Sequence, residues 1–132
     1  PELAGTDFLT VHVPLDETTR HLISKRELAA LTPGAIVINC ARGGIVDEDA
    51  LLAALESDHI RAAAVDVMSE EPPRADHPLI ARKDVLMTPH NGAAAMSAAI
   101  AMAEVAAQNV IDLFAGELKD EMTFNLEGLQ KP

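Results

Sequence analysis

The chain has 132 residues, which is enough for one domain with a single hydrophobic core. Hydrophobic residues make up 48% of the sequence, a share too high for an intrinsically disordered protein. The chain has 21 Asp and Glu residues against 10 Lys and Arg residues, and the resulting net charge of −11 excludes a general nucleic-acid-binding surface, because phosphates are neutralised by clustered cations.

Strands and helices are predicted to alternate along the chain. A short β-branched and apolar segment predicts a strand over residues 7–13, which stops at Pro14. The spacing of Ser24 and Glu27 is typical of a capping box, in which the two residues bond each other's backbone amides and open a short helix. The unbroken apolar run over residues 35–40 predicts a strand that is covered on both faces.

The same alternation continues after this strand. Asp47 is predicted to be the N-cap of a helix over residues 48–57, because its carboxylate can accept from the free amides of the first turn. A third strand is predicted over residues 62–67, and a short fourth strand over residues 85–87.

The last predicted element is a long, alanine-rich helix over residues 95–115, which Gly116 is expected to end. Its apolar residues recur at three- and four-residue steps, so one face of the helix is apolar. These residues are Met96, Ile100, Ala103, Ala107, Val110, Ile111 and Phe114.

The order of strands and helices predicts an α/β fold with a parallel sheet, whose strands are joined by helical crossovers. Ligands of such sheets bind outside the carboxyl ends of the strands. Pro14, Arg42, Asp66 and His90 each lie at or just past the end of a predicted strand. The fold would therefore bring these four residues to one edge of the sheet.

The blocks that contain these residues resemble a known family. They are "VHVPLDETTRHLISKREL", "LTPGAIVINCARGGIVDEDALLAAL", "AAAVDVMSEEPP", "HPLI" and "VLMTPHNGA". In order and spacing they are similar to blocks of the D-isomer-specific 2-hydroxyacid dehydrogenases, which include 3-phosphoglycerate dehydrogenase and the glyoxylate/hydroxypyruvate reductases. The resemblance covers about residues 3–125. It implies a partial Rossmann-like sheet, the second half of a dinucleotide-binding domain, followed by a long C-terminal helix.

The resemblance implies a catalytic set of three residues. Arg42, in "ARGG", matches the arginine that grips the substrate carboxylate, for which a permanently charged, planar guanidinium is suited. His90 matches the general acid/base, which protonates the carbonyl oxygen as hydride reaches the carbon. Glu71 matches the carboxylate that pairs with this histidine and orients its ring. The position directly before Pro72 favours Glu71 over its neighbour Glu70.

The resemblance also implies a nicotinamide cofactor, which is NAD in most of the family, with NADP not excluded. Asp66 matches the residue that binds the nicotinamide carboxamide. Val13, Pro14, Cys40 and Ala41 match positions whose backbones line the cofactor. The cofactor-binding set implied by the family is completed by Arg42, His90 and Gly92.

Each assignment has a structural alternative. Arg42 could be a surface charge beside a helix, and His90 could be a structural histidine after a proline. Asp66 could cap the loop that follows it, and Glu70 and Glu71 could be a solvated acidic pair, which is the usual meaning of neighbouring charges.

No metal site is expected, because His and Cys are too few and are not spaced as ligands. Cys40, the only cysteine, allows no disulfide within the chain and is expected to be a small packed thiol rather than a nucleophile. The other histidines are expected to be structural or exposed, with no assigned role. They are His12, His21, His59 and His77.

A complete dinucleotide-binding domain needs a glycine-rich turn after its first strand, and the seven glycines here form no G-x-G-x-x-G. We therefore expect a fragment that is inactive alone. Residues 1–115 would be the second half of the cofactor domain and residues 116–132 a tail that returns toward a missing substrate domain. The strand at 7–13 would be an edge built to be central, and such edges self-associate.

The function predicted for the complete protein is reversible hydride transfer between a nicotinamide cofactor and a small 2-oxo or 2-hydroxy acid. Family members of this kind are usually homodimers. We expect a cytoplasmic protein, with no membrane span and no secretory leader. The alternative is an NAD(H)-sensing interaction protein of the corepressor type, which keeps the same three residues and uses the fold to bind partners.

Overall fold

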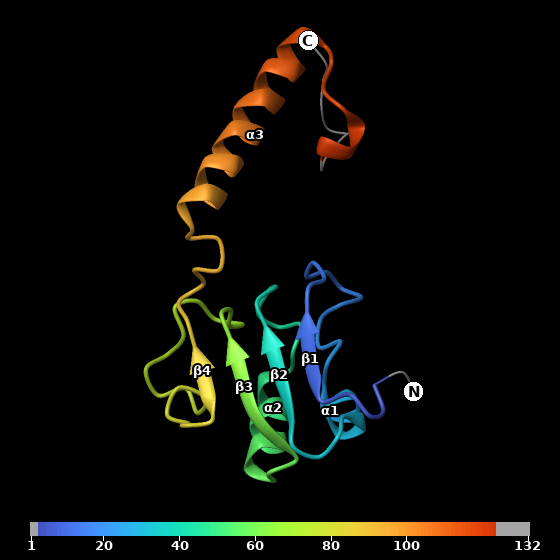
Figure 1. The fold of residues 1–132 in the computed structure, drawn as a ribbon, viewed down its shortest axis with the longest axis vertical. Helices are drawn as coiled ribbons and strands as arrows, with labels where there is room; N and C mark the ends of the chain where they lie inside the picture. Colours follow the sequence, from blue (N-terminus) through green and yellow to red (C-terminus); the bar gives the residue numbers. More distant parts are fainter. Residues whose placement is uncertain (1–2, 124–132) are drawn as a thin grey trace. The chain divides into compact units, whose positions relative to one another are not determined.

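The computed structural model describes residues 3–123, in which four strands form one parallel sheet in the order β1-β2-β3-β4 (Figure 1). The strands are β1 (Phe8–Val11), β2 (Ala35–Asn39), β3 (Ile60–Val65) and β4 (Val85–Met87). All three strand pairs are parallel, so the carboxyl ends of the strands share one edge of the sheet. The predicted α/β fold with a parallel sheet is confirmed.

Two short helices join the first three strands. The helix α1 (Lys25–Ala30) has the predicted capping box, in which the Glu27 carboxylate accepts from the Ser24 amide at 3.3 Å. The helix α2 (Glu48–Glu56) begins after the predicted N-cap Asp47, whose carboxylate accepts from the Ala50 amide at 3.1 Å. Side-chain caps of this kind satisfy amides that have no partner inside a helix.

The strand ends differ from the prediction. β1 stops at Val11, because its neighbour β2 ends at Asn39, which lies opposite Val11 in the register. His12 and Val13 therefore belong to a loop. β3 begins two residues earlier than predicted and ends before Asp66, which places the Asp66 side chain past the sheet edge.

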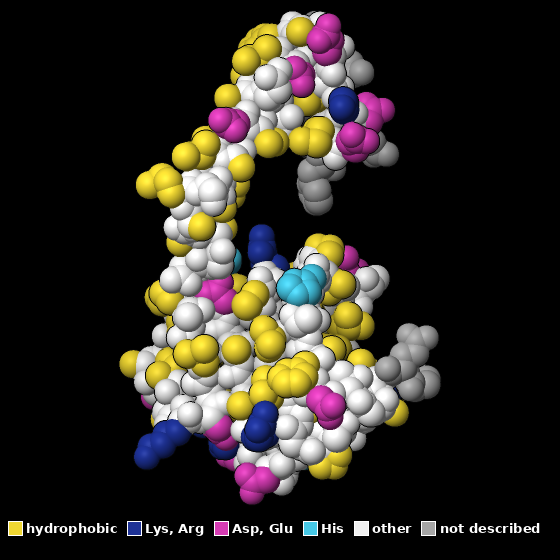
Figure 2. All heavy atoms as spheres, viewed as in Figure 1, with side chains coloured by type: hydrophobic (Ala, Val, Ile, Leu, Met, Phe, Trp, Pro, Cys, Tyr) yellow, Lys and Arg dark blue, Asp and Glu magenta, His cyan; other side chains and the backbone are white. Residues whose placement is uncertain are grey.

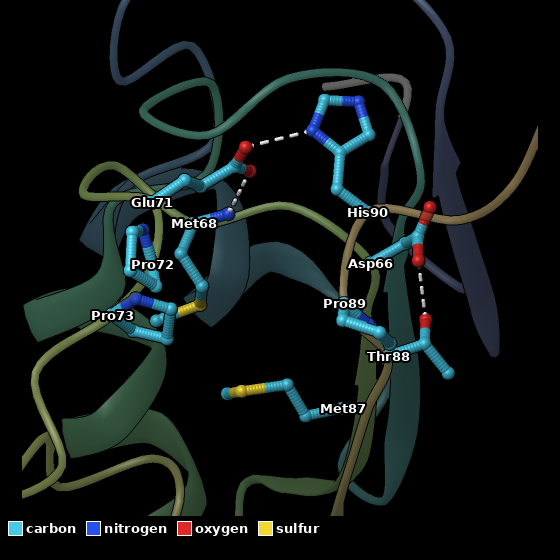
Figure 3. Close-up of a pocket in the computed structure, with 9 residues that line it drawn as sticks. All are labelled: Asp66, Met68, Glu71, Pro72, Pro73, Met87, Thr88, Pro89 and His90. Atoms are coloured by element: carbon cyan, nitrogen blue, oxygen red, sulfur yellow. Dashed lines mark hydrogen bonds and ion pairs between the residues drawn. The ribbon is translucent and has the colours of Figure 1, made fainter.

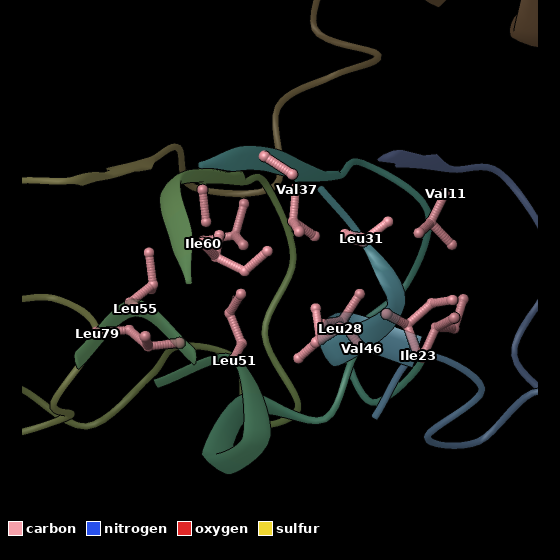
Figure 4. Packing of buried hydrophobic residues seen from close by; sticks show 14 of the residues in the cluster. Val11, Ile23, Leu28, Leu31, Val37, Val46, Leu51, Leu55, Ile60 and Leu79 are labelled. Carbon is pink, nitrogen blue, oxygen red and sulfur yellow. The ribbon is translucent and has the colours of Figure 1, made fainter. Parts of the chain in front are cut away.

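The hydrophobic core lies between one face of the sheet and the two short helices (Figure 4). Along β2, the buried residues Ala35, Val37 and Asn39 alternate with the half-buried Ile36 and Ile38. The prediction that this strand is covered on both faces is therefore wrong for the described structure. The alternation is that of a sheet with one covered face.

Within residues 3–92, the second face of the sheet is apolar and is not covered by a helix. Phe8, which is 65% exposed, lies opposite Ile36, and Leu86, which is 67% exposed, lies opposite Ala64. Figure 2 shows hydrophobic side chains gathered over this face. Apolar surface of this extent is unusual on a soluble monomer, so this face is built to be covered.

Residues Ala93–Pro132 form a unit separate from Pro1–Gly92. The unit contains the predicted long helix, α3 (Met96–Ala115), and a short 3₁₀ helix, η1 (Asp120–Met122). Gly116 ends α3 in the left-handed conformation, as predicted, with φ +73°. The proposed domain boundary at residue 116 stays a prediction, and part of the predicted tail lies outside the described residues.

No residue of α3 is buried, and by length and composition this helix could cross a membrane. The expectation that no segment meets this criterion is therefore wrong. The helix α3 consists mostly of alanine and larger apolar residues, and it contains only two charged residues, Glu104 and Asp112. One such helix is weak evidence of a membrane span, because core helices of soluble proteins have the same composition.

Candidate functional site

The carboxyl edge of the sheet is formed by the loops that follow the strands. The loop after β2 contains Arg42, the loop after β3 contains Asp66 and Glu71, and the loop after β4 contains His90. Parallel pairing places all of these loops at one edge, as the sequence predicts.

The loop that carries Arg42 is held by Asn39, the last residue of β2. The Asn39 side chain is buried, donates to the Arg42 carbonyl at 3.0 Å and accepts from the Ala41 amide at 3.1 Å. The Arg42 guanidinium is exposed and donates to the Ala41 carbonyl at 2.7 Å. A guanidinium has five N–H donors, so most of them remain available to a ligand.

Asp66 is only 5% exposed and accepts three hydrogen bonds through its carboxylate, of which Figure 3 shows the one from Thr88. The donors are the Thr88 hydroxyl at 2.5 Å, the Asn91 amide at 3.0 Å and the Gly92 amide at 2.8 Å. The Thr88 hydroxyl, followed by the Asn91 amide, lowers the pKa of Asp66 below its ordinary value of 3.8. The group is therefore a carboxylate at neutral pH.

His90 and Glu71 form a hydrogen-bonded pair (Figure 3). The distance between Nδ1 of His90 and Oε2 of Glu71 is 2.7 Å. The other oxygen of Glu71 accepts from the Met68 amide at 3.0 Å, which fixes the plane of the carboxylate. The bond to His90, followed by the bond to the Met68 amide, lowers the pKa of Glu71 below its ordinary value of 4.5.

The loops after β2 and β3 are packed against each other at Gly43. A Cβ atom on Gly43 would lie 2.0 Å from the Met68 carbonyl oxygen and 2.6 Å from the Ser69 nitrogen. The Glu48 carboxylate at the start of α2 also accepts from the amide and the hydroxyl of Ser69, at 2.6 and 2.8 Å. The absence of a side chain at Gly43 therefore lets the two backbones touch.

Two cavities open at this edge. The cavity between β1 and β2 has a volume of about 580 Å³ and is lined by His12, Val13, Pro14, Leu15, Cys40, Ala41 and Arg42. The cavity beside β4 has a volume of about 570 Å³ and is lined by Asp66, Met68, Glu71, Pro72, Pro73, Met87, Thr88, Pro89 and His90. The structure thus brings the predicted site residues together in two groups. Gly92 joins the second group through its bond to Asp66.

Cys40 differs from expectation, whereas His12 does not. Cys40 is exposed rather than packed, because β2 ends one residue earlier and the thiol lies in the loop beside Arg42. His12 is exposed as well, and its ring is hydrogen-bonded to the Thr10 hydroxyl at 2.7 Å. Both side chains line the cavity at the ends of β1 and β2.

Sequence reasoning missed two residues that hold the site. Asn39 holds the loop of Arg42, and Thr88 holds the carboxylate of Asp66. Each is a polar residue at the end of an apolar strand, where a side chain can leave the sheet and bond the loops beyond it. That position in the sequence is the clue that could have identified them.

Comparisons with known proteins agree with this architecture. Residues 2–92 match the family model described as "D-isomer specific 2-hydroxyacid dehydrogenase, NAD binding domain". D-3-phosphoglycerate dehydrogenase of Methanocaldococcus jannaschii is 45% identical over 88% of this chain and 22% of its own length. Glyoxylate reductase of Aeropyrum pernix is 42% identical over 88% of this chain and 35% of its own length.

Two solved structures show the same fold. A D-isomer specific 2-hydroxyacid dehydrogenase from Xanthobacter autotrophicus Py2, in complex with NADPH and MES, is 44% identical with a TM-score of 0.75. The match covers 87% of this chain and 47% of that one. D-lactate dehydrogenase with NAD+ from Lactobacillus jensenii is 33% identical with a TM-score of 0.76, over 87% of this chain and 38% of that one.

The chain spans 22% and 35% of the lengths of the two curated relatives. The family model matches residues 2–92, which include the parallel sheet and all three loops of the site. The resemblance in the sequence is therefore confirmed, and the chain belongs to the D-isomer specific 2-hydroxyacid dehydrogenase family, with residues 2–92 forming part of the NAD binding domain.

Proposed function

We propose that this chain forms the acid–base half of an oxidoreductase that transfers hydride between a nicotinamide cofactor and a 2-oxo or 2-hydroxy acid. The observation that carries the proposal is the pair of His90 and Glu71, 2.7 Å apart at the ligand-binding edge of a parallel sheet. The curated relatives named above are both oxidoreductases by name, which favours an enzyme over an interaction protein of the corepressor type.

His90 is the residue that moves the proton. Because Nδ1 faces the Glu71 carboxylate, Nε2 is the ring nitrogen that remains for the substrate oxygen. In the reduction of an oxo acid, Nε2–H donates its proton to the carbonyl oxygen while the carbon receives hydride, and in the oxidation Nε2 takes the proton back. The Glu71 carboxylate fixes the ring and compensates the charge of the imidazolium.

Arg42 is the residue that binds the substrate. Its exposed guanidinium can make two parallel hydrogen bonds to a carboxylate, and this geometry selects an acid over a neutral ketone. Asn39 keeps the backbone of this loop in place from the buried side. A small 2-oxo or 2-hydroxy acid has the carboxylate and the adjacent oxygen that this pair of residues, Arg42 and His90, requires.

The residues at the edge fit the nicotinamide end of the cofactor. The Oδ2 atom of Asp66 accepts one hydrogen bond from the described residues, so it has a second acceptor position for a carboxamide N–H. Val13, Pro14 and Ala41 give the neighbouring cavity apolar walls. The sequence contains no G-x-G-x-x-G, so a different segment must bind the pyrophosphate. When bound, the cofactor supplies or accepts the hydride.

NAD is the cofactor that the family description names, and the two related structures contain NADPH and NAD+. The proposal therefore covers both cofactors. It also includes a homodimer and a cytoplasmic location for the complete protein. Among the described residues, β1 pairs with no second neighbour and one sheet face is apolar and exposed. Both features support association with further protein surface, within the chain or between copies.

The test is an assay of the complete protein that contains this chain. Oxidation of NADH and NADPH is measured with glyoxylate, hydroxypyruvate, pyruvate and phosphohydroxypyruvate. We expect turnover of at least one oxo acid, a loss of about 10²-fold or more in kcat for His90→Ala, and a large rise in substrate KM for Arg42→Ala.

The matched control for Arg42→Ala is Arg61→Ala, which removes an exposed arginine from the second position of β3, at the opposite end of the strand from the site. This variant should keep the kinetics of the unchanged protein. Tight NADH binding without turnover of any oxo acid would contradict the proposal and support the corepressor-type alternative.

A further inference from the structure

The backbone of His90 is in a conformation that needs support. Its φ angle is +50°, in the left-handed region that side chains other than glycine adopt rarely. Such a residue keeps this conformation only where its surroundings fix it, and residues of this kind cluster at functional sites. The hydrogen bonds around His90 show which residues fix it.

Three successive amides of the His90 loop donate to one residue, Asp66. The His90 amide donates to the Asp66 carbonyl at 2.8 Å, and the amides of Asn91 and Gly92 donate to its carboxylate at 3.0 and 2.8 Å. The turn over residues 90–92 is therefore attached to Asp66 through both its backbone and its side chain. The position of the His90 ring depends on the orientation of this carboxylate.

Thr88 determines that orientation. Its hydroxyl donates to the Asp66 carboxylate at 2.5 Å, the shortest of the bonds to this group (Figure 3). Its own amide donates to the Val65 carbonyl at 3.0 Å, so Thr88 is still attached to the end of the sheet. The hydroxyl thus connects the rigid sheet to the carboxylate that holds the turn.

We propose that Thr88 is a positioning residue of the reaction: its hydroxyl fixes the Asp66 carboxylate, which holds the turn that presents His90 to Glu71. The proposal rests on the proposed function, in which His90 transfers the proton. It also gives Asp66 a second role, because this carboxylate orients the acid–base residue as well as facing the cofactor.

Removal of the hydroxyl should affect chemistry more than binding. Without the Thr88 hydroxyl, the carboxylate of Asp66 can turn away from the amides of Asn91 and Gly92. The left-handed backbone of His90 can then relax. The 2.7 Å bond from His90 to Glu71 then lengthens or becomes populated only part of the time. Arg42 belongs to a different loop, so binding of the substrate carboxylate should change little.

The test compares Thr88→Val, which has a similar shape without the hydroxyl, with Thr88→Ser, which keeps the hydroxyl, in the complete protein. We expect the valine variant to lose about tenfold in kcat with little change in either KM, because a misplaced proton donor slows the chemical step. The serine variant should stay within about twofold of the unchanged protein. Thr32→Val, before β2, is the control for loss of a threonine elsewhere.

A second measurement is independent of turnover. The ring nitrogens of ¹⁵N-labelled histidines are observed by NMR, and the resonances of His90 are assigned from their loss in His90→Gln. Thr88→Val should shift the His90 resonances, whereas Thr88→Ser and Thr32→Val should not. Thr88→Ala, which also lacks the hydroxyl and adds no bulk, replaces the valine variant if that variant does not fold.

Two results would overturn the proposal. One is a valine variant with unmoved His90 resonances and unchanged kcat. The other is a valine variant in which only the KM for NADH rises, because Asp66 would then serve the cofactor alone. If the complete protein turns over no oxo acid, the proposed function fails, and the His90 resonances still decide whether Thr88 positions the ring.

Discussion

Replacement of Gly43 by alanine should disrupt the site without removing a functional group. The added Cβ would lie 2.0 Å from the Met68 carbonyl oxygen, whereas ordinary contact begins at 3.4 Å. The Met68 backbone would therefore have to retreat by about 1.4 Å, and because backbone rather than a flexible side chain is involved, the strain cannot relax locally. Gly43 does not have a positive φ, so the clash is the main cost.

This displacement of the Met68 backbone would also move the proposed acid–base pair, Glu71 and His90. The Met68 amide holds Glu71 at 3.0 Å, and Glu71 holds His90 at 2.7 Å. A displacement of this size exceeds the tolerance of a hydrogen bond, and a misplacement of about 1 Å can cost about 10²-fold in rate. Overpacking of this kind also destabilises a fold by about 1–3 kcal/mol.

The assay is kcat/KM of the complete protein with its best oxo acid, together with the urea midpoint of unfolding. The matched control is Gly34→Ala, where the new methyl meets nothing within 4 Å but the backbone has φ +89°. This control should lose about 1–2 kcal/mol of stability from backbone strain and keep its activity. A Gly43→Ala variant with kcat/KM within about twofold of the unchanged protein would refute the coupling of the two loops.

Two further predictions concern the stability of the fold at low pH and the self-association of the chain. The pKa of Asp66 is lowered on folding, so this carboxylate stabilises the fold above its unfolded pKa of about 3.8, and that contribution is lost as the pH falls through the folded pKa. The urea midpoint should therefore fall more steeply below about pH 3.8 than in Asp66→Asn, and equal slopes would contradict the assignment. The 132-residue chain alone should self-associate and show no turnover, because the edge of β1 and the apolar sheet face around Phe8 are open. Ultracentrifugation that shows a cooperatively melting monomer would contradict this.

The sequence predicts the order and type of the elements well, because these depend on local patterns. The capping box at Ser24, the N-cap at Asp47 and the stop at Gly116 each depend on a residue and its near neighbours. The ends of β1 and β3 were predicted less well. A strand ends where its neighbour ends, and the register between two strands is a contact between distant parts of the chain.

The site also divides into residues that local sequence patterns identify and residues that only contacts between distant segments reveal. Arg42, Asp66 and His90 could be selected as candidates because each follows a strand, and the resemblance pointed to Glu71. The contribution of Thr88 could not be predicted in this way, because the Asp66 side chain that it contacts comes from the loop after a different strand, 22 residues earlier in the chain. The burial of β2 on one face could not be predicted either, because its apolar run does not show which faces other elements cover.

The hydrogen bonds that orient the acid–base pair all come from residues of the NAD binding domain match. Glu71 is held by Met68, and the turn of His90 is held by Asp66 and Thr88, within residues 2–92. These 132 residues contain no G-x-G-x-x-G, the turn that holds the pyrophosphate in a complete dinucleotide-binding domain. The geometry of the proposed proton-transfer pair, His90 and Glu71, is therefore built from neighbouring residues of this chain. We therefore expect the isolated chain to be silent because it cannot bind its ligands, even though its acid–base pair is formed.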